Sequence, residues 1–219
     1  MKKINIAIDG PSGAGKSTIS DILASKLGYI HLDTGAMYRT VAYKALEKGY
    51  KMDEEEKIVK LIAELSFKQT QDGHIICNGE DISSQIRQNN ISMAASDVSK
   101  LLGVRKALVL LQQKIAEDKG YIVDGRDICE VVLPNAEIKL YLTASCEARA
   151  KRRLEQNKEA GIVDDYDTIL EDIRKRDYQD SHREHSPLHK TDDAIEIDSS
   201  DKTIDDVVNF VLDLVNKQL

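Results

Sequence analysis

The sequence predicts an α/β fold in which a five-stranded parallel sheet carries helices on both faces. Five short apolar segments alternate with segments of helical periodicity, a pattern typical of parallel strands joined by right-handed crossovers. A glycine-rich loop directly follows the first apolar segment and precedes a helical one, as in α/β folds that bind phosphate groups. The 219 residues are enough for one full core and a small appended unit.

The predicted strands are short apolar runs, as expected of strands that are buried on both faces. They are INIAI (4–8), YIHL (29–32), YIV (121–123), IKLYL (138–142) and AIEI (194–197). Ligands of open parallel sheets bind at the carboxyl ends of the strands. Asp9, Asp33 and Asp124 directly follow three of the runs, so we expect these carboxylates at one edge of the molecule.

Helices are predicted between and after these strands. One follows Gly15, and the others cover 35–48, 53–65, 104–118, 146–159, 165–182 and 203–217. The last has its apolar residues at helical spacing and should cover the sheet. The segment 67–82 breaks the alternation, because it contains DG and NG turn signals between short alternating runs. It predicts small antiparallel strands inserted between the second and third core strands.

Composition excludes several classes of protein. The formal net charge of −7 argues against a nucleic-acid partner, since phosphate contacts need a basic surface. Cys77, Cys129 and Cys146 form no CxxC pair, which favours a reducing compartment over a disulfide framework or a zinc site. Asp9 interrupts the first apolar run before it reaches signal-peptide length, and no run approaches the ~18 apolar residues of a membrane span. We therefore expect a soluble, cytoplasmic protein without a membrane partner.

The segment GPSGAGKS, from Gly10 to Ser17, fits the phosphate-binding loop pattern G-x-x-x-x-G-K-[ST]. The glycines let backbone N–H groups turn toward phosphate oxygens, and the helix N-terminus adds positive potential. In this pattern Lys16 reaches the β- and γ-phosphates of ATP, and the Ser17 hydroxyl binds Mg²⁺. The expected ATP-binding residues are Gly10, Gly13, Ala14, Gly15, Lys16, Ser17 and Thr18.

The loop alone does not say what is done with the nucleotide. The guanine-reading motif N-K-x-D is absent, since the Asn-Lys pair at 157–158 continues as Glu-Ala. An apolar strand that ends in a carboxylate pair, usual in motor ATPases, is also absent. A small kinase is the interpretation that remains.

Two arginines point to the acceptor of such a kinase. Arg39 in DTGAMYR (33–39) and Arg126 in DGRD (124–127) each follow the end of a predicted strand, so both can clamp one phosphate group bidentately. A phosphate monoester has a second pKa of about 6 and needs no base to deprotonate it. An arginine-lined site without an obvious base therefore favours a phosphate acceptor. The alternatives are surface arginines paired with nearby acids, and a hydroxyl acceptor with Asp33 as its base.

Two helices carry further arginines. Arg176, Asp180 and Arg183 share one helix face at i, i+4 and i+7. Upstream, Arg149, Arg152 and Arg153 cluster at i, i+3 and i+4. Arginine rather than lysine on both faces favours phosphate recognition by a closing lid, whereas the alternative is a solvated, salt-bridged surface. The histidines of HREHSPLH (182–189) do not predict a metal site, because Pro187 breaks the helix between the second and third.

Together GPSGAGKST, DTGAMYR, MAASDVS…VR, DGRDI and IRKRDYQDS resemble the bacterial cytidylate kinases, of the nucleoside monophosphate kinase group. The resemblance runs nearly end to end. It implies a P-loop kinase with strand order 2-3-1-4-5, a requirement for ATP and Mg²⁺, and a monomer. It also implies a core (1–34, 104–147 and 190–219), a monophosphate-binding region with an insertion (35–103) and a lid (148–185).

The resemblance assigns roles to individual residues. It implies that Thr34, Arg39 and Arg126 hold the ribose-phosphate part of the acceptor, that Ser96, Arg105 and Asp127 read cytosine, and that Arg176, Asp180 and Arg183 contact sugar and phosphates. The lid arginines correspond to Arg149, Arg152 and Arg153, and the catalytic set is Lys16, Arg126, Arg153 and Arg176. The implied reaction transfers the γ-phosphoryl group of ATP to CMP or dCMP, giving ADP and CDP or dCDP.

The chemistry of the bases supports a preference for CMP and dCMP over UMP. Cytosine has an amino donor where uracil has a carbonyl acceptor, so a carboxylate such as Asp127 favours cytosine. A guanidinium such as Arg105 suits the O2 and N3 acceptors of the base. Competing hypotheses are a P-loop kinase for another small acceptor and a nucleotide-binding switch that hydrolyses ATP slowly.

One stretch departs from the pattern of the cytidylate kinases. After DGRDI that pattern continues with Gly-Thr, whereas this chain has Cys129 and Glu130. If the glycine supplies a positive φ, cysteine at this position predicts a changed local turn.

Overall fold

The computed structural model describes residues 3–70, 72–159 and 161–219. The predicted amino-terminal core segment, the inserted strands and the lid extend over the remaining positions 1–2, 71 and 160, which lie outside the described residues.

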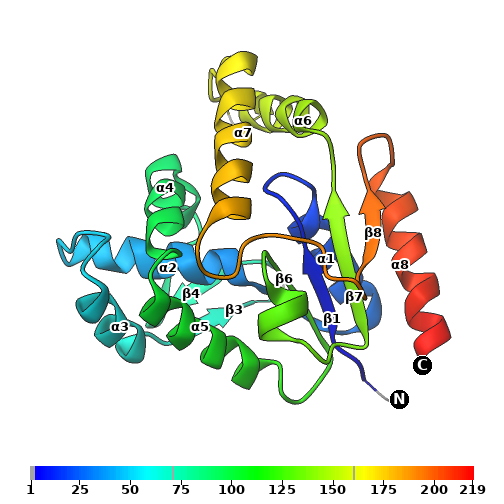
Figure 1. Cartoon of the computed structure of the whole chain (residues 1–219), viewed down its shortest axis with the longest axis horizontal. Coiled ribbons are helices and arrows are strands. Elements are labelled where there is room, and N and C mark those ends of the chain that lie inside the picture. The colour runs from blue at the N-terminus through cyan, green and yellow to red at the C-terminus, as the bar shows by residue number, and fades with distance from the viewer. Residues whose placement is uncertain (1–2, 71, 160) are drawn as a thin grey trace.

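Five strands form a parallel sheet in the order β2-β6-β1-β7-β8 (Figure 1). They span Ile6–Asp9 (β1), Ile30–Asp33 (β2), Tyr121–Gly125 (β6), Ile138–Thr143 (β7) and Ile195–Asp198 (β8). Each corresponds to one predicted run, and the order is the expected 2-3-1-4-5, so the predicted fold class is confirmed. The register pairs Asp9 with Gly125 and Asp33 with Asp124, which brings the carboxyl ends of β1, β2 and β6 to one edge.

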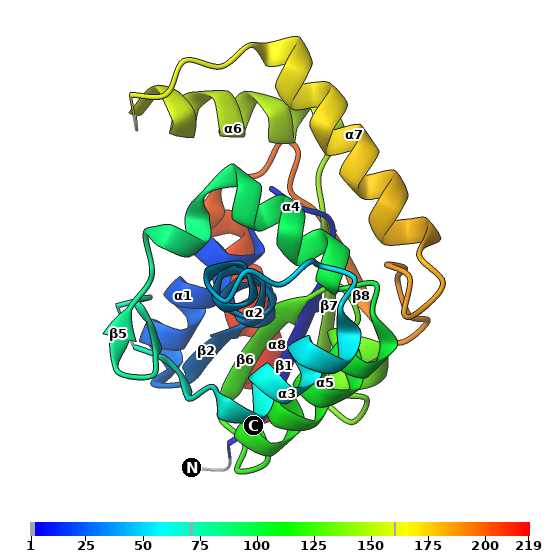
Figure 2. The same ribbon diagram turned by 90° about the vertical axis from the view of Figure 1, so that its left-hand side faces the viewer.

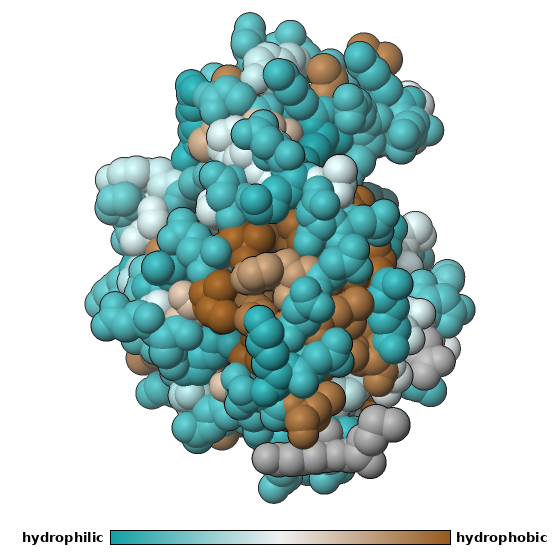
Figure 3. All heavy atoms as spheres, turned by 90° about the vertical axis from the view of Figure 1, so that its right-hand side faces the viewer, coloured by the Kyte–Doolittle hydropathy of each residue, from teal (hydrophilic) through white to brown (hydrophobic). Residues whose placement is uncertain are grey.

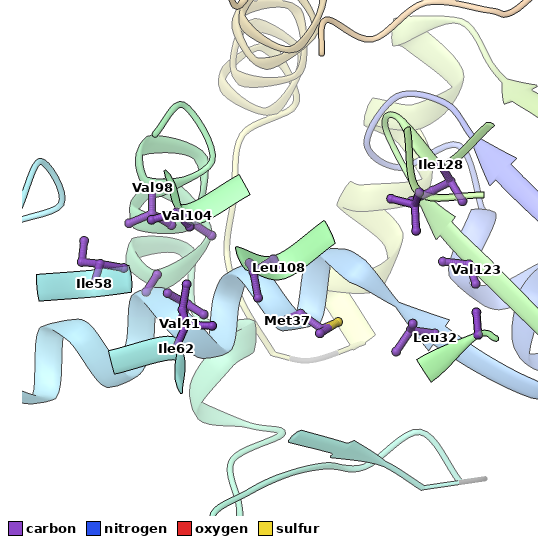
Figure 4. Packing of buried hydrophobic residues seen from close by; sticks show 14 of the residues in the cluster. Leu32, Met37, Val41, Ile58, Ile62, Val98, Val104, Leu108, Val123 and Ile128 are labelled. Carbon is purple, nitrogen blue, oxygen red and sulfur yellow. The ribbon is translucent and has the colours of Figure 1, made fainter. Parts of the chain in front are cut away.

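Successive side chains of the central strand face two different cores. Ile6 and Ile8 of β1 pack in a cluster with α1 (Lys16–Leu27) and α8 (Ile204–Gln218). Ala7 lies in the cluster on the other face. That cluster is formed with α2 (Thr34–Glu47), α3 (Glu55–Glu64), α4 (Asn89–Val98) and α5 (Leu102–Ile115). Figure 4 shows Leu32, Met37, Val41, Ile58, Ile62, Val98, Val104, Leu108, Val123 and Ile128 packed in it.

The inserted region forms the predicted antiparallel strands. They span Phe67–Gln69 (β3), Ile75–Cys77 (β4) and Glu80–Asp81 (β5), and they form a separate three-stranded sheet. A 3₁₀ turn at Gln85–Arg87 and helix α4 follow, and neither was predicted. The α4 segment is short and rich in Asn, Ser and Asp, which have weak helix propensity in isolation. Ala94 and Ala95 are buried in its packed face, so tertiary contact with its neighbours stabilises the helix.

A pair of helices between β7 and β8 lies above the carboxyl edge of the main sheet. They are α6 (Cys146–Glu159) and α7 (Tyr166–His182), which pack against one another (Figures 1 and 2). Asp165 caps α7 by accepting a hydrogen bond from the Thr168 N–H (3.0 Å). All seven predicted helices are present, with ends within three residues of prediction.

The face of the core that α8 covers and the α6–α7 unit differ in surface hydropathy. On the face that α8 covers, apolar side chains are exposed among hydrophilic ones, whereas the α6–α7 unit is mostly hydrophilic (Figure 3). Within the described ranges, no helix combines the length and apolar character needed to cross a bilayer.

Candidate active site

The loop from Gly10 to Ser17 leaves β1 and turns into the N-terminus of α1. Gly10, Gly13 and Gly15 have φ values of 148°, 78° and 93°, in a region that side chains disfavour. At Gly10 the packing is also tight, because an added Cβ would lie 1.9 Å from the carbonyl oxygen of Leu142 on β7. Only glycine fits there, and the loop keeps its backbone groups free to surround an anion.

Lys16 begins α1 and folds its side chain back over the loop. Its Nζ donates hydrogen bonds to the carbonyl oxygens of Gly10 (2.8 Å) and Pro11 (2.9 Å), and the residue is 6% exposed. Burial, followed by the nearby charge of Arg126, lowers the pKa of Lys16 to about 7. Phosphate oxygens close to Nζ favour the protonated amine, so this arrangement suits an anionic ligand.

His31 on β2 connects two carboxylates beside the loop. Its Nδ1 lies 2.7 Å from Oδ1 of Asp21 on α1, and its Nε2 lies 2.7 Å from Oδ1 of Asp124 on β6. Burial lowers the pKa of His31, but the hydrogen bonds to Asp124 and Asp21 outweigh it and raise the pKa to about 10. Burial raises the pKa of Asp124, but the hydrogen bond and charge of His31 bring it below its ordinary value. The three side chains are thus an imidazolium between two carboxylates.

The side-chain oxygens of Asp124 and Ser17 lie together at the end of the loop. The Ser17 hydroxyl donates a hydrogen bond to Oδ2 of Asp124 (3.1 Å). A hydroxyl and a single carboxylate next to a phosphate loop are the ligands that Mg²⁺ prefers, because it takes its other oxygens from phosphates and water. The residues present therefore fit Mg²⁺ bound together with a nucleotide. In residues 3–70, 72–159 and 161–219, no cluster of three or more His, Cys, Asp or Glu side chains forms an all-protein metal site.

Asp9 has a structural role at the end of β1. It is 2% exposed and accepts hydrogen bonds from the N–H groups of Ile128 and Cys129, both at 2.8 Å. Burial raises its pKa despite these bonds. Residues 128–132 form a π-helical turn. Cys129 is not among the residues with positive φ, so this turn accommodates cysteine without left-handed backbone.

Three arginines gather at the carboxyl edge. Arg39 pairs with Asp33 (2.8 Å) and Arg126 pairs with Asp180 (2.8 Å), so each has an acid beside it, and both side chains are largely buried. Burial, then the charges of Arg126 and Arg39, lowers the pKa of Arg176 to about 10. In the described part of the chain, Nε of both Arg39 and Arg176 is buried without a hydrogen-bond partner. Like charges at close range and unused donors both favour binding of an anion here.

A second buried pair lies nearby. Arg105 on α5 forms an ion pair with Asp127 and also donates to the Ser99 carbonyl (3.1 Å). The Arg105 guanidinium lies 5.9 Å from the centre of the Tyr38 ring, whose hydroxyl has no partner among the described residues. Burial, then the charge of Arg105, lowers the pKa of Arg183, which donates to the Ser186 carbonyl (2.7 Å). This group of side chains combines a carboxylate, guanidinium groups and an aromatic ring, which are groups that can bind a nucleobase.

Two other predicted contact residues already have partners. The Thr34 hydroxyl donates to the Asp124 carbonyl (2.7 Å). Ser96 on α4 accepts a hydrogen bond from Gln179 on α7 (2.8 Å), which ties the inserted region to the upper helices.

The three arginines of α6 differ in placement. Arg149 is buried, donates to the Ser12 carbonyl of the phosphate loop (3.0 Å) and pairs with Asp177 on α7. Arg152 donates to the Ser199 carbonyl, whereas Arg153 is exposed. Arg149 is thus the member of the cluster in contact with the loop.

The cytidylate kinase family model matches residues 6–217, which is nearly the whole chain. The chain belongs to the cytidylate kinase family. It is 51% identical to a cytidylate kinase of Caldicellulosiruptor saccharolyticus over 220 residues, covering 99% of this chain and 97% of that protein. It is 47% identical to a cytidylate kinase of Bacillus licheniformis over 221 residues, covering 99% and 98%. The expected family is therefore confirmed.

A solved structure of an uncharacterized protein from Eubacterium ventriosum shares the fold at a TM-score of 0.55 and 15% sequence identity. The match covers 98% of this chain and 99% of that one.

Within this cytidylate kinase fold, the predicted residues around the loop and the acceptor arginines lie at the same edge of the sheet. No local sequence pattern predicts the pairing of His31 with Asp21 and Asp124, or the contact of Arg149 with the loop, because the partners are distant in the chain. A cavity of about 470 Å³ lies at the opposite end of the sheet, near Asn5 and Pro134, and no predicted site residue lines it.

Proposed function

We propose that this chain is a cytidylate kinase that transfers the γ-phosphoryl group of ATP to CMP or dCMP, giving ADP and CDP or dCDP. The observation that carries the acceptor assignment is the group of Arg39, Arg126 and Arg176, crowded together at the edge where the phosphate loop lies. Arg39 and Arg126 each have one carboxylate beside them, and the positive charge that remains, above all that of Arg176, favours a further anion. Membership of the cytidylate kinase family supports the same acceptor.

On the donor side, the loop residues Gly10, Gly13, Ala14, Gly15 and Thr18 surround the triphosphate in this proposal, and Lys16 neutralises its β- and γ-oxygens. Ser17 and Asp124 would hold Mg²⁺, which supplies charge neutralisation to the phosphate oxygens when it is bound. Arg149 fixes the loop by its bond to the Ser12 carbonyl.

On the acceptor side, Arg39, Arg126 and Arg176 orient the phosphate of the monophosphate in line with the donor. The attacking oxygen is already ionised, so positioning and charge stabilisation are enough. Asp33 is poorly placed to act as a base, since Oδ1 accepts from the Ala36 N–H (2.9 Å) and Oδ2 pairs with Arg39. It acts instead as the helix cap that positions Arg39.

The base is read by Asp127 and Arg105 in this proposal. Asp127 accepts from the amino group of cytosine and would face a carbonyl oxygen in uracil. An unpaired buried polar contact costs roughly 1–3 kcal/mol, or about 5- to 150-fold in selectivity. Ser96, Thr34, Asp180 and Arg183 complete the surroundings of the nucleoside.

We further propose the division into a core (1–34, 104–147 and 190–219), a monophosphate-binding region (35–103) and a lid (148–185). Arg153 is exposed, so its proposed catalytic role requires that the lid closes and brings it toward the phosphates. Lids of this kind complete their site when the substrate binds. A monomer is proposed on the resemblance alone, and a cytoplasmic location is proposed on the cysteine usage and composition of the sequence.

The test is ADP release, measured by a coupled assay, with ATP and Mg²⁺ alone and after addition of CMP, dCMP or UMP. The proposal expects release that depends on CMP or dCMP and is much slower with UMP. Release independent of the acceptor would instead indicate a slow nucleotide switch. Asp33→Asn distinguishes a hydroxyl acceptor: if its pH–rate profile shows loss of a proton acceptor, the phosphate-acceptor account is wrong.

A further inference from the structure

A buried histidine, His31, lies next to the proposed metal ligands Ser17 and Asp124 and is hydrogen-bonded to Asp124. His31 lies on β2, is 7% exposed, and bridges Asp21 of α1 to Asp124 of β6 at 2.7 Å on each side. The side-chain nitrogen of Gln69 on β3 also lies 3.4 Å from Nδ1, so four elements of the fold meet at one imidazole ring.

We propose that His31 is a positioning residue for the divalent cation bound with the nucleotide: it holds Oδ1 of Asp124, so that Oδ2 stays directed at Ser17. This inference rests on the proposed function, because it assumes that the cation accompanies ATP at this end of the loop.

The geometry of Asp124 supports the inference. Its two oxygens have different partners, His31 on Oδ1 and the Ser17 hydroxyl on Oδ2. The carboxylate is almost completely buried, and Lys16 is close enough to stabilise its charge. If the His31 donor were removed, Oδ1 of the carboxylate would lose the partner that holds it and the group would reorient, because a buried charge without its partner is strongly unfavourable. The ligand oxygen would then leave the Ser17 hydroxyl.

Asp21 fixes the ring itself. The buried ring is bonded through both nitrogens, and the bond from Nδ1 to Asp21 adds to the restraint that the bond from Nε2 to Asp124 places on its orientation. Asp21 has a side chain that is 52% exposed and lies away from the loop, so it acts on the metal-ligand pair only through His31. Partners of this kind, which orient a ligand carboxylate from behind, typically change metal affinity by about 10- to 100-fold when they are lost.

A histidine that merely fills the core would need no such bridge, and the two roles make different predictions. Loss of packing alone should weaken every property of the loop, including nucleotide binding without metal. Loss of positioning should weaken the metal-dependent part alone.

The experiment measures ADP affinity by calorimetry in EDTA and in Mg²⁺, and Mn²⁺ affinity of the ADP complex by electron paramagnetic resonance. For His31→Leu we expect Mn²⁺ affinity to fall by about 10- to 100-fold, with metal-free ADP affinity unchanged. His31→Gln, which retains an amide donor near the position of Nε2, should recover part of the loss. Asp21→Asn leaves the His31 ring in place and changes a residue at an exposed site, so it should show a smaller loss of Mn²⁺ affinity.

Asp213→Asn on α8 is the matched control, an exposed helical acid away from the loop, and should match the wild type in both measurements. Equal losses with and without metal in His31→Leu would overturn the inference, as would unchanged Mn²⁺ affinity in both His31→Leu and Asp21→Asn. Failure of the proposed function is separate, because it would appear in the wild type as ADP release that CMP does not stimulate.

Discussion

Replacing His31 with leucine should change the way in which the stability of the nucleotide-free protein depends on pH. Burial by itself would lower the pKa of His31, but the hydrogen bonds to Asp124 and Asp21 outweigh it, so folding raises the pKa from 6.5 to about 10. The unfolded chain releases this proton near pH 6.5, whereas the folded chain retains it until about pH 10. The stabilisation by His31 is therefore complete below pH 6.5 and is lost as the pH rises toward 10.

The size of the effect follows from the two pKa values. They differ by about 3.5 pH units, and one unit corresponds to about 1.36 kcal/mol, so the contribution reaches about 5 kcal/mol. Lys16 contributes with the opposite sign. Burial lowers its pKa from 10.5 to about 7, so the unfolded chain holds the extra proton between these values and stability rises with pH. In the wild type the two contributions nearly cancel between pH 7 and 10.

A variant that lacks one of the two groups, His31 or Lys16, should show the pH dependence that the other group contributes. Relative to the wild type at the same pH, the free energy of unfolding of His31→Leu should increase from pH 7 to 10, and that of Lys16→Met should decrease over the same range. His189→Leu, at a half-exposed site, is the control and should follow the wild type. Urea unfolding in EDTA, followed by far-UV circular dichroism because the chain has no Trp, measures these values. A constant difference between wild type and His31→Leu from pH 6.5 to 10 would refute the imidazolium assignment.

Three further predictions concern the nucleotide sites. Arg39→Lys and Arg126→Lys should each lower turnover with CMP by roughly 100-fold, since a point charge cannot replace a bidentate clamp. The ATP affinity, measured by calorimetry, should stay near the wild-type value. An equal loss of ATP affinity would place these residues at the donor site. Asp127→Asn should lower the ratio of kcat/KM for CMP to that for UMP by about 5- to 150-fold, and an unchanged ratio would mean that other groups read the base. Gly10→Ala should abolish ATP binding, because its Cβ would lie 1.9 Å from the carbonyl oxygen of Leu142. Gly49 has open space around it, so Gly49→Ala should lower stability by only about 1–2 kcal/mol and leave ATP binding intact.

Much of the fold follows from local sequence patterns. Short apolar runs and helical periodicity predict all five core strands and seven helices, since burial on both faces of a sheet requires such runs. Helix α4 was not predicted, because its residues have weak propensity and the helix depends on packing through Ala94 and Ala95. The π-helical turn at 128–132 likewise depends on the distant carboxylate of Asp9, which accepts its first N–H groups.

The sequence by itself determined the phosphate loop, the two strand-end arginines and the family, because these depend on residues within a few positions of one another. The conformation of Gly10 and the placement of Lys16 are determined by the backbone of the loop to which both belong. Only the tertiary structure decided which charges pair: Asp124 with His31, Asp180 with Arg126, and Arg149 with the loop. Such pairs join segments that the strand order brings together, and their strength depends on burial, which lowers the local dielectric and is a property of the folded chain alone.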